Sequence, residues 1–375
     1  MIDRAQTTAL ENALAAIDAY PANSPGDALV RAKCRGLMLG YDHRWKDAGY
    51  EALAVEKLFH ADLFNPDTTK KSRTFTMAGK IDVLARLNNR TFVIDHKTTS
   101  EAIDDPNAPY WQQLAIDGQV SQYLYLMWLE GIRPDGAIWD VVKKPSILPR
   151  ELKAGELASV VSSGKWFGRA VDDYYRMQLS GKTVKRESLE MYEARLASDC
   201  STERPERYFQ RRSVPRLDND LLEYGRDLWQ VGQSIRRSRE KKERLVKSTG
   251  ACLNFHSPCR FLGICSGHDT PDSDRWKKKE FRHRELEIDH DTLTNSRVRT
   301  FQLCPVKHYY EYELAIERFD EEEKESLFFG SMFHSAQEAW WNAYKVEEIS
   351  NVDSENRQSP IGGGRHSAAE AQLFS

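Results

Sequence analysis

The sequence predicts an α/β fold, in which helices pack against a β-sheet. Apolar residues have helical spacing over most of residues 5–60, a period of two from Arg73, and helical spacing again over residues 111–130. Hydrophobic residues make up 40% and charged residues 30% of the 375-residue chain. A chain of this length and composition is typical of a soluble globular protein with a sizeable buried core.

The elements follow in a clear order along the chain. Helices are predicted over residues 7–20, 27–45 and 51–63, then strands over 73–87 and 90–98, a helix over 111–130 and a strand over 136–144. Two long helices, 156–181 and 217–248, flank residues 203–216. Asn88 and Asn89 separate the two strands of the hairpin and predict a tight turn.

Charge and hydropathy exclude some classes of protein. No run approaches the roughly 18 apolar residues of a membrane span, and residues 1–18 lack the basic-then-apolar pattern of a signal peptide. We therefore expect a cytoplasmic protein without a membrane partner. The net charge of −3 gives no overall attraction for nucleic acid, so a DNA contact requires local basic patches.

Three charged residues stand in the otherwise apolar hairpin. Asp95 and Lys97 are two residues apart on a strand and share a face. Antiparallel pairing across the turn places Asp82 opposite residue 95 or 96, so the two carboxylates meet. Such carboxylates can hold Mg²⁺, and a lysine beside them can stabilise negative charge or act on an attacking water. For a lone D-x-K, the alternative is a solvated pair on a surface strand.

Three short motifs extend this site over about 45 residues: Gly79-x-x-Asp82, Asp95-His96-Lys97-Thr98 and Gln119-x-x-x-Tyr123. Their order and spacing resemble the PD-(D/E)XK nuclease superfamily, specifically its RecB-like branch. That branch includes the nuclease domains of RecB and AddAB proteins, CRISPR-associated exonucleases and phage nucleases. The resemblance implies a restriction-endonuclease-like core with a central mixed β-sheet flanked by helices, to which this chain adds long helices and a cysteine cluster.

The resemblance also implies roles for these residues. Asp82 and Asp95 would bind Mg²⁺ or Mn²⁺, with the main-chain carbonyl of His96 as a further ligand. Lys97 would act on the nucleophilic water. The helix residues Gln119 and Tyr123 would support the site and position the DNA strand.

Two family elements occur at an unusual place in the chain. Members of the family usually begin with a Cys-Pro motif and a G-x-x-x-H-x-x-x-E motif, whose histidine binds the metal. Residues 1–60 contain neither, whereas residues 292–345 contain Cys304-Pro305 and then Gly330, His334 and Glu338. The resemblance implies that His334 is a metal ligand if this segment docks on the hairpin. The alternative for His334 is a helix histidine that binds no metal.

Three explanations account for this order: a natural circular permutation, a headless nuclease fused to the head of a second copy, or a faulty gene model. We divide the chain into a nuclease-like domain, a charged linker, a displaced or duplicated nuclease head and a disordered tail, at residues 1–268, 269–291, 292–345 and 346–375.

Four of the six cysteines, Cys252, Cys259, Cys265 and Cys304, fall in the last third of the chain. Four thiolates can hold a zinc ion or an iron–sulfur cluster, and the absence of a C-x-x-C pair argues against an ordinary zinc ribbon. Several RecB-like nucleases carry a [4Fe–4S] cluster held by one early and three late cysteines, so the resemblance implies such a cluster as a clamp. Buried cysteines without a metal are the alternative, and we expect this for Cys34.

Basic and aromatic residues offer candidate DNA contacts. Lys143, Lys144, Arg211 and Arg212 are predicted to contact phosphates, together with the basic run from 236 to 247. The aromatic candidates for base stacking are Tyr208, Phe209 and Trp166. A solvated helix face is the alternative for the basic run.

Together with the resemblance, these observations predict a metal-dependent DNA nuclease; the resemblance implies exonuclease action on single-stranded or free DNA ends as the commonest style of the family. DNA repair, recombination with a helicase partner, or phage DNA processing are the settings that the resemblance implies. Two alternatives come from other classes: a catalytically inactive DNA-binding or assembly module that keeps the fold, and a zinc-binding structural protein.

Overall fold

A mixed β-sheet forms the centre of the protein. The computed structural model describes residues 2–21, 24, 26–254, 257–280, 291–319 and 325–346. The strands follow the order β1-β2-β3-β4-β7, and β11 pairs with β2 on the side away from β1. Their bounds are β1 (Glu51–Phe64), β2 (Lys71–Leu87), β3 (Arg90–Thr99), β4 (Gly136–Lys143), β7 (Phe209–Val214) and β11 (Asp291–Leu293). The β3–β4 and β2–β11 pairs are parallel and the others antiparallel, which confirms the predicted mixed sheet.

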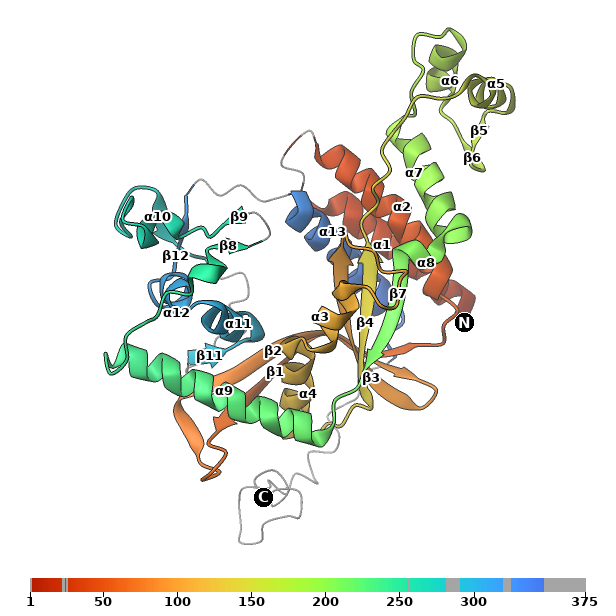
Figure 1. The fold of residues 1–375 in the computed structure, drawn as a ribbon. Coiled ribbons are helices and arrows are strands. Elements are labelled where there is room, and N and C mark those ends of the chain that lie inside the picture. The colour runs from red at the N-terminus through yellow and green to blue at the C-terminus, as the bar shows by residue number, and fades with distance from the viewer. Residues whose placement is uncertain are drawn as a thin grey trace.

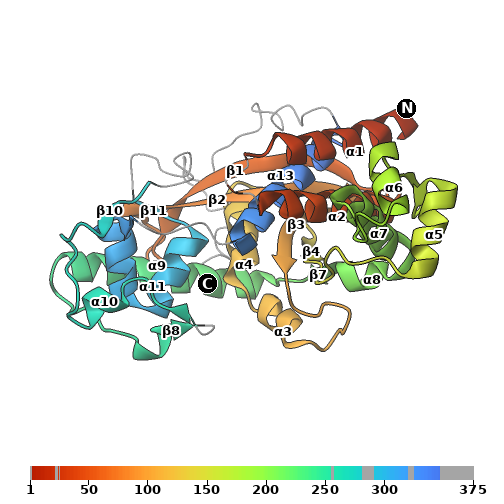
Figure 2. The same cartoon turned by 90° about the horizontal axis from the view of Figure 1, so that it is seen from above.

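Helices cover both faces of this sheet, as Figures 1 and 2 show. One face carries α1 (Ile2–Ala19), α2 (Asp27–Trp45) and α13 (Glu325–Asn342), with α7 (Leu189–Ser198) packed against α2. The other face carries α3 (Pro109–Ala115), α4 (Gly118–Leu129), α9 (Asp218–Arg239) and α11 (Asn295–Leu303). Strand β3 shows why two cores form: Phe92 and Ile94 enter the first, whereas Val93 enters the second.

Two smaller regions project from this core. One contains α5 (Ala154–Ser163), β5 (Lys165–Trp166), β6 (Arg169–Ala170) and α6 (Asp173–Ser180) and has an apolar cluster of its own. The other, which we name the cysteine lobe, contains η2 (Thr249–Ala251), β8 (Leu253–Asn254), β9 (Ser257–Pro258), α10 (Leu262–Cys265), β10 (Trp276–Lys278), α12 (Pro305–His308), η4 (Tyr309–Glu313) and β12 (Ile316–Arg318). The turns η1 (Asp199–Glu203) and α8 (Pro205–Tyr208) lead from α7 into β7.

Most predicted elements are confirmed. Helices α1 and α2, strands β2, β3 and β4, and the turn between β2 and β3 lie where the sequence places them. Asn88 and Asn89 both have positive φ, at 50° and 62°, as a two-residue hairpin turn requires. The predicted helix over 111–130 is present but divided, because Asp117 accepts a hydrogen bond from the Gln119 backbone and begins α4 anew.

Four predicted elements are wrong in type or length. The predicted helix 51–63 is strand β1, because pairing with β2 along nearly its whole length overrides helix propensity. The predicted helix 156–181 is interrupted by the β5–β6 hairpin, since Gly164 ends α5 at φ +65°. The helix predicted over 217–248 ends at Arg239, and the expected linker 269–291 contains strand β10, which pairs with β12. The predicted disordered tail lies outside the described residues from 347 onwards.

The C-terminal elements belong to the same sheet and core as the N-terminal ones. Strand β11 adds to β2, and α13 packs along α1 and α2. Beyond α13, Lys345 forms a parallel bridge with Ala52 of β1. The displaced head of the sequence thus lies against the nuclease-like part within one chain. Among the described residues, no helix is both long and apolar enough to cross a membrane.

The close approach of α9 to α4 depends on Gly225. A Cβ atom on this residue would lie 2.6 Å from the hydroxyl of the buried Tyr125, whereas a Cβ on Gly155 of α5 meets nothing within 4 Å.

We expect Gly225→Ala to lower the free energy of unfolding by roughly 1–3 kcal/mol, because the buried ring must move. Gly155→Ala is the matched control and should be neutral or stabilising by up to about 1 kcal/mol. Urea denaturation measures both, and equal effects would contradict this account.

Candidate metal and catalytic site

Three carboxylates lie in a row across three adjacent strands. Glu56 of β1 stands opposite Asp82 of β2. Asp82 in turn stands opposite Asp95 of β3, one step beyond the last paired residues of these two strands. The flanking pairs that fix this register are Val55↔Val83, Lys57↔Ile81 and Val83↔Ile94. Like charges directly opposite one another destabilise a sheet. The row therefore favours a bound cation.

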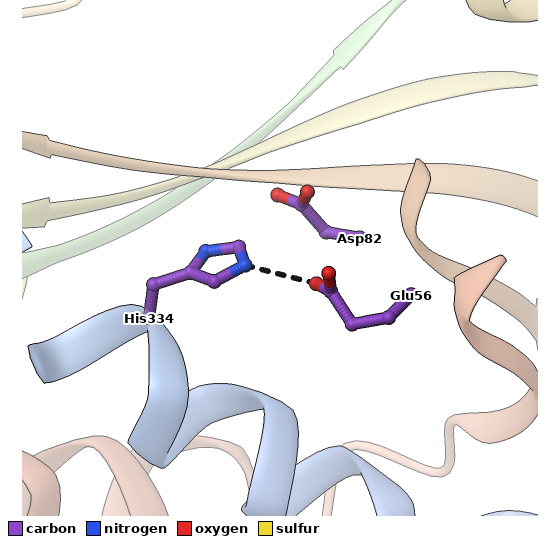
Figure 3. A group of neighbouring side chains, drawn as sticks. All are labelled: Glu56, Asp82 and His334. Atoms are coloured by element: carbon purple, nitrogen blue, oxygen red, sulfur yellow. Dashed lines mark hydrogen bonds and ion pairs between the residues drawn. The ribbon is translucent and has the colours of Figure 1, made fainter. Parts of the chain in front are cut away.

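Helix α13 adds a histidine to this row. The Nε2 atom of His334 lies 2.9 Å from Oε1 of Glu56, and the carboxylate of Asp82 lies beside them (Figure 3). Each of these three residues offers one ligand atom, and the three atoms lie within 4.8 Å of one another. The structure thus brings His334 to Asp82 across about 250 residues of sequence, as the resemblance implied.

Glu56 is the site residue that sequence reasoning missed. The segment around it was predicted to be a helix, which hid its position opposite Asp82. Its backbone has φ +51°, an uncommon conformation for a non-glycine residue and one that is enriched at functional sites. The signal that would have found it is a carboxylate on a strand next to the strand of Asp82.

Asp95 shows that the site fits a divalent cation. Its side chain is 1% exposed; Oδ2 forms an ion pair with Lys97, whereas Oδ1 has no hydrogen-bond partner. Burial raises the pKa of Asp95 to about 6, against the opposing effect of the Lys97 charge. A buried carboxylate with a free oxygen, close to other oxygen ligands and an imidazole, suits Mg²⁺ or Mn²⁺.

Lys97 is held in place from three directions. Its ammonium ion-pairs with Asp95, donates a hydrogen bond to Oε1 of Gln119 at 2.8 Å, and lies 5.0 Å from the ring centre of Trp139. The amide of Gln119 in turn donates to the hydroxyl of Tyr123 at 2.7 Å. The predicted Gln119 and Tyr123 therefore lie beside Lys97 and fix its position.

The electrostatics keep Lys97 and His334 protonated in the metal-free protein. Burial alone would lower the pKa of Lys97, but Asp95 and Asp82 outweigh it and raise that pKa. Burial likewise opposes protonation of His334, yet the hydrogen bond to Glu56 and the charge of Asp82 raise its pKa to about 9. Burial would raise the pKa of Glu56, but His334 and Lys80, whose Nζ lies 2.7 Å away, lower it.

The backbone and the imidazole of His96 make separate contacts. Its backbone N–H donates to Oδ2 of Asp82 at 2.7 Å, which holds that carboxylate in place. Its imidazole points away from Asp95 and is buried beside Asp140 and Gln337. The role predicted for its main-chain carbonyl as a metal ligand stays a prediction.

Several of the predicted DNA contacts are wrong. The Arg211 side chain is 6% exposed and its guanidinium pairs with Asp140 at 3.1 Å, because β7 directs it into the core. The Lys144 ammonium donates to the carbonyl of Ser326 at the start of α13; this residue is partly exposed, and its predicted DNA contact stays a prediction. The aromatic residues proposed for base stacking are all buried: Tyr208, Phe209 and Trp166.

Two further basic residues remain as candidate DNA contacts. Arg212 is partly exposed, with its guanidinium 3.9 Å from the ring centre of Trp111, and Lys143 is partly exposed at the end of β4. Their predicted role is retained on these grounds.

The four late cysteines gather in the cysteine lobe. Burial raises the pKa of the Cys265 thiol; Lys247 opposes this shift, whereas the thiols of Cys259, Cys304 and Cys252 add to it. A single zinc ion would hold its sulfurs at about 2.3 Å and hence within about 4 Å of one another. In the described part of the chain, no three of these sulfurs lie within 4.8 Å of one another. The zinc and iron–sulfur alternatives for these cysteines both stay predictions. Cys34, by contrast, is buried in the helical core, as predicted.

Comparison with known proteins identifies the family. The sequence model of the PD-(D/E)XK nuclease superfamily matches residues 2–148 and 292–363, which is more than half of the chain. The chain belongs to the PD-(D/E)XK nuclease superfamily. The first matched segment contains the carboxylate row and Lys97, and the second contains His334. The superfamily match therefore covers both halves of the site and leaves residues 149–291 outside it.

Other comparisons are weaker. A crystal structure of SSO0001 matches 48% of this chain and 84% of its own at 15% sequence identity, with a TM-score of 0.18, too low to bear on the fold. No curated protein matches the chain. For this member of the superfamily, the site geometry therefore carries the functional argument.

The raised pKa of His334 predicts how stability depends on pH. A folded-state pKa above the usual value of 6.5 means that His334 stabilises the metal-free fold fully below about pH 6.5 and loses this effect as the pH rises through about 9. Since the side chain is 36% exposed, solvent screening reduces the contribution to about 1 kcal/mol. Urea denaturation of metal-free protein at pH 6.5 and 9.5 measures it, with His334→Gln as control. An unchanged pH dependence in that variant would contradict the assignment.

Proposed function

We propose that this protein is a Mg²⁺- or Mn²⁺-dependent deoxyribonuclease of the RecB-like branch. The observation that carries the proposal is the convergence of Glu56, Asp82 and His334, with Asp95 on the next strand paired to a lysine that Gln119 and Tyr123 hold. Exonuclease action on single-stranded or free DNA ends is the activity that the resemblance favours. Repair, recombination with a helicase partner, or phage DNA processing is the corresponding setting.

The site residues have different roles in the proposed phosphodiester hydrolysis. The carboxylates and His334 would hold the cation, which when bound lowers the pKa of water and neutralises phosphate charge. His334 must give up its proton to bind, so cation binding releases that proton. Lys97 has a raised pKa and remains an ammonium at neutral pH, which favours stabilising the negative charge on phosphate over acting as a base. Gln119 and Tyr123 orient this ammonium.

The order of the family elements is best explained by circular permutation in our proposal. In support, α13 packs on α1 and α2 of the same chain, and β11 extends the sheet at β2. If residues 292–345 were instead the head of a second nuclease copy, the place of the head on this sheet would be left to another protein chain. The proposed boundaries are a nuclease-like domain, a charged connection and a displaced head at residues 1–268, 269–291 and 292–345.

Substitution of Lys97 tests the nuclease proposal. We expect the wild type to degrade labelled single-stranded DNA with Mn²⁺, and Lys97→Ala to reduce the rate by about 10²–10⁴-fold, because an oriented cationic donor is lost. The matched control is Lys57→Ala, which removes an exposed lysine from β1 and should retain wild-type activity. Wild-type activity in Lys97→Ala would overturn the proposed site.

An inactive DNA-binding or assembly module is the second candidate function. A wild-type protein that binds labelled DNA yet shows no cleavage with either metal would favour it. The buried Oδ1 of Asp95, which has no hydrogen-bond partner, speaks against it, because a cation ligated there would offset the cost of burying this oxygen.

We also propose a [4Fe–4S] cluster at Cys252, Cys259, Cys265 and Cys304. In support, the thiols of Cys259, Cys304 and Cys252 all raise the pKa of the Cys265 thiol, so the four lie in one neighbourhood. Cys304 begins α12 and the other three lie in the preceding part of the lobe, so the cluster would join segments that are distant in sequence.

Metal analysis tests the cluster. Anaerobically purified protein should contain about four iron atoms per chain and absorb broadly in the visible range. Cys259→Ser should lose both the iron and the colour, whereas Cys34→Ala, which removes a buried thiol from the helical core, should keep them. One zinc ion per chain, or no metal, would contradict the proposal.

A further inference from the structure

One face of α13 contacts the imidazole of His96. His334, Gln337 and Trp341 are spaced i, i+3 and i+7 and therefore form a stripe along the helix. The His96 ring centre lies 5.9 Å from that of His334 and 6.2 Å from that of Trp341. Between them, the side-chain amide of Gln337 lies 3.2 Å from Nδ1 of His96. The same helix face thus carries a metal ligand and the residues that hold His96.

His96 is also the residue between Asp95 and Lys97. Its neighbours point to the α4 side of the sheet, whereas its imidazole points to the α13 side, as alternation along a strand requires. Its backbone N–H binds Asp82 at 2.7 Å. One residue therefore connects the carboxylate row to α13.

A buried polar network lies against the same imidazole nitrogen that Gln337 contacts. Oδ2 of Asp140 lies 3.2 Å from Nδ1 of His96 and accepts hydrogen bonds from Tyr41 and Arg211. Burial opposes ionisation of Asp140, but the charges of Arg211 and His96 lower its pKa, so the carboxylate stays charged. These groups come from β4, α2 and β7. Nδ1 of His96 is thus the point at which α13, through Gln337, meets the polar network of the sheet.

Gln337 stands out among the residues that dock α13. The helix face is otherwise mostly apolar, with Phe333, Ala336 and Trp340 buried. Apolar packing is non-directional and tolerates small rotations or shifts, whereas a hydrogen bond restricts them. Gln337 is 1% exposed, and burying an amide costs free energy unless it is bonded. Its hydrogen-bond partner on β3 is His96, which lies between Asp95 and Lys97.

We propose that Gln337 is a positioning residue that locks α13 onto His96 and so places the His334 ligand in register with the carboxylate row. The inference rests on the proposed metal-dependent function. It adds the contact that aligns the His334 ligand with the carboxylate row. Gln337 itself touches neither the cation nor the substrate. Its loss is expected to weaken cation binding while leaving Lys97 and the carboxylates in place.

A pair of substitutions on α13 tests this role. Gln337→Met keeps the length of the side chain and removes its hydrogen bonds. Trp340→Phe is the matched control, because it removes another buried hydrogen bond of the same helix, from Nε1 to Oδ1 of Asp42 at 2.9 Å, without touching β3. Urea denaturation of both variants shows whether they lose similar stability.

Two readouts are compared with the wild type: binding of Mn²⁺ alone, followed by the electron paramagnetic resonance of free Mn²⁺, and the Mn²⁺ dependence of DNA cleavage. We expect Gln337→Met to raise the half-saturating Mn²⁺ concentration at least about tenfold, with the maximal rate changed less, and Trp340→Phe to leave both near wild type.

The outcomes separate this inference from the proposed function. Equal Mn²⁺ affinity in Gln337→Met and the wild type, or equal weakening in both variants, would overturn the positioning role while a metal-dependent wild type kept the proposed function. A wild type that neither binds Mn²⁺ nor cleaves DNA would overturn the proposed function, and this inference with it.

Discussion

Repulsion between three carboxylates is the constraint on which this structure depends. Glu56, Asp82 and Asp95 lie opposite one another on adjacent strands, and Asp95 is almost fully buried. Such a row is unfavourable in a sheet unless positive charge compensates it. The metal-free protein supplies that charge through Lys97, Lys80 and protonated His334. A bound divalent metal would replace the positive charge of His334, which must lose its proton to become a ligand.

The surrounding fold serves to bring the compensating groups from opposite sides of the sheet. Helix α4 lies on one side and holds Lys97 through Gln119 and Tyr123. Helix α13 lies on the other and delivers His334. Because α13 is the last described helix, the site forms only when the end of the chain returns to its first strands. The distance in sequence between His334 and the carboxylates therefore does not prevent them from meeting.

Burial also decides which charges are free to meet DNA. Arg211 belongs to a basic segment by sequence but lies in the core, paired with Asp140 and surrounded by aromatic rings that include Trp45 and Trp341. A guanidinium in this setting supports the sheet beneath the active site. The residues outside the superfamily match form the α5–α6 projection and most of the cysteine lobe, but they also supply β7 and α9 to the central sheet and its core.

The sequence by itself determined the hairpin, the clustering of Asp82, Asp95 and Lys97, and the position of Gln119 and Tyr123 beside them. These features are local, because the turn sets the strand register and the helix period sets the shared face. Only the tertiary structure decided that residues 51–64 form a strand, that Glu56 joins the row, that Arg211 is buried, and that His334 reaches Asp82. Each of these depends on contacts between segments distant in sequence, and local propensity carries no information about such pairings.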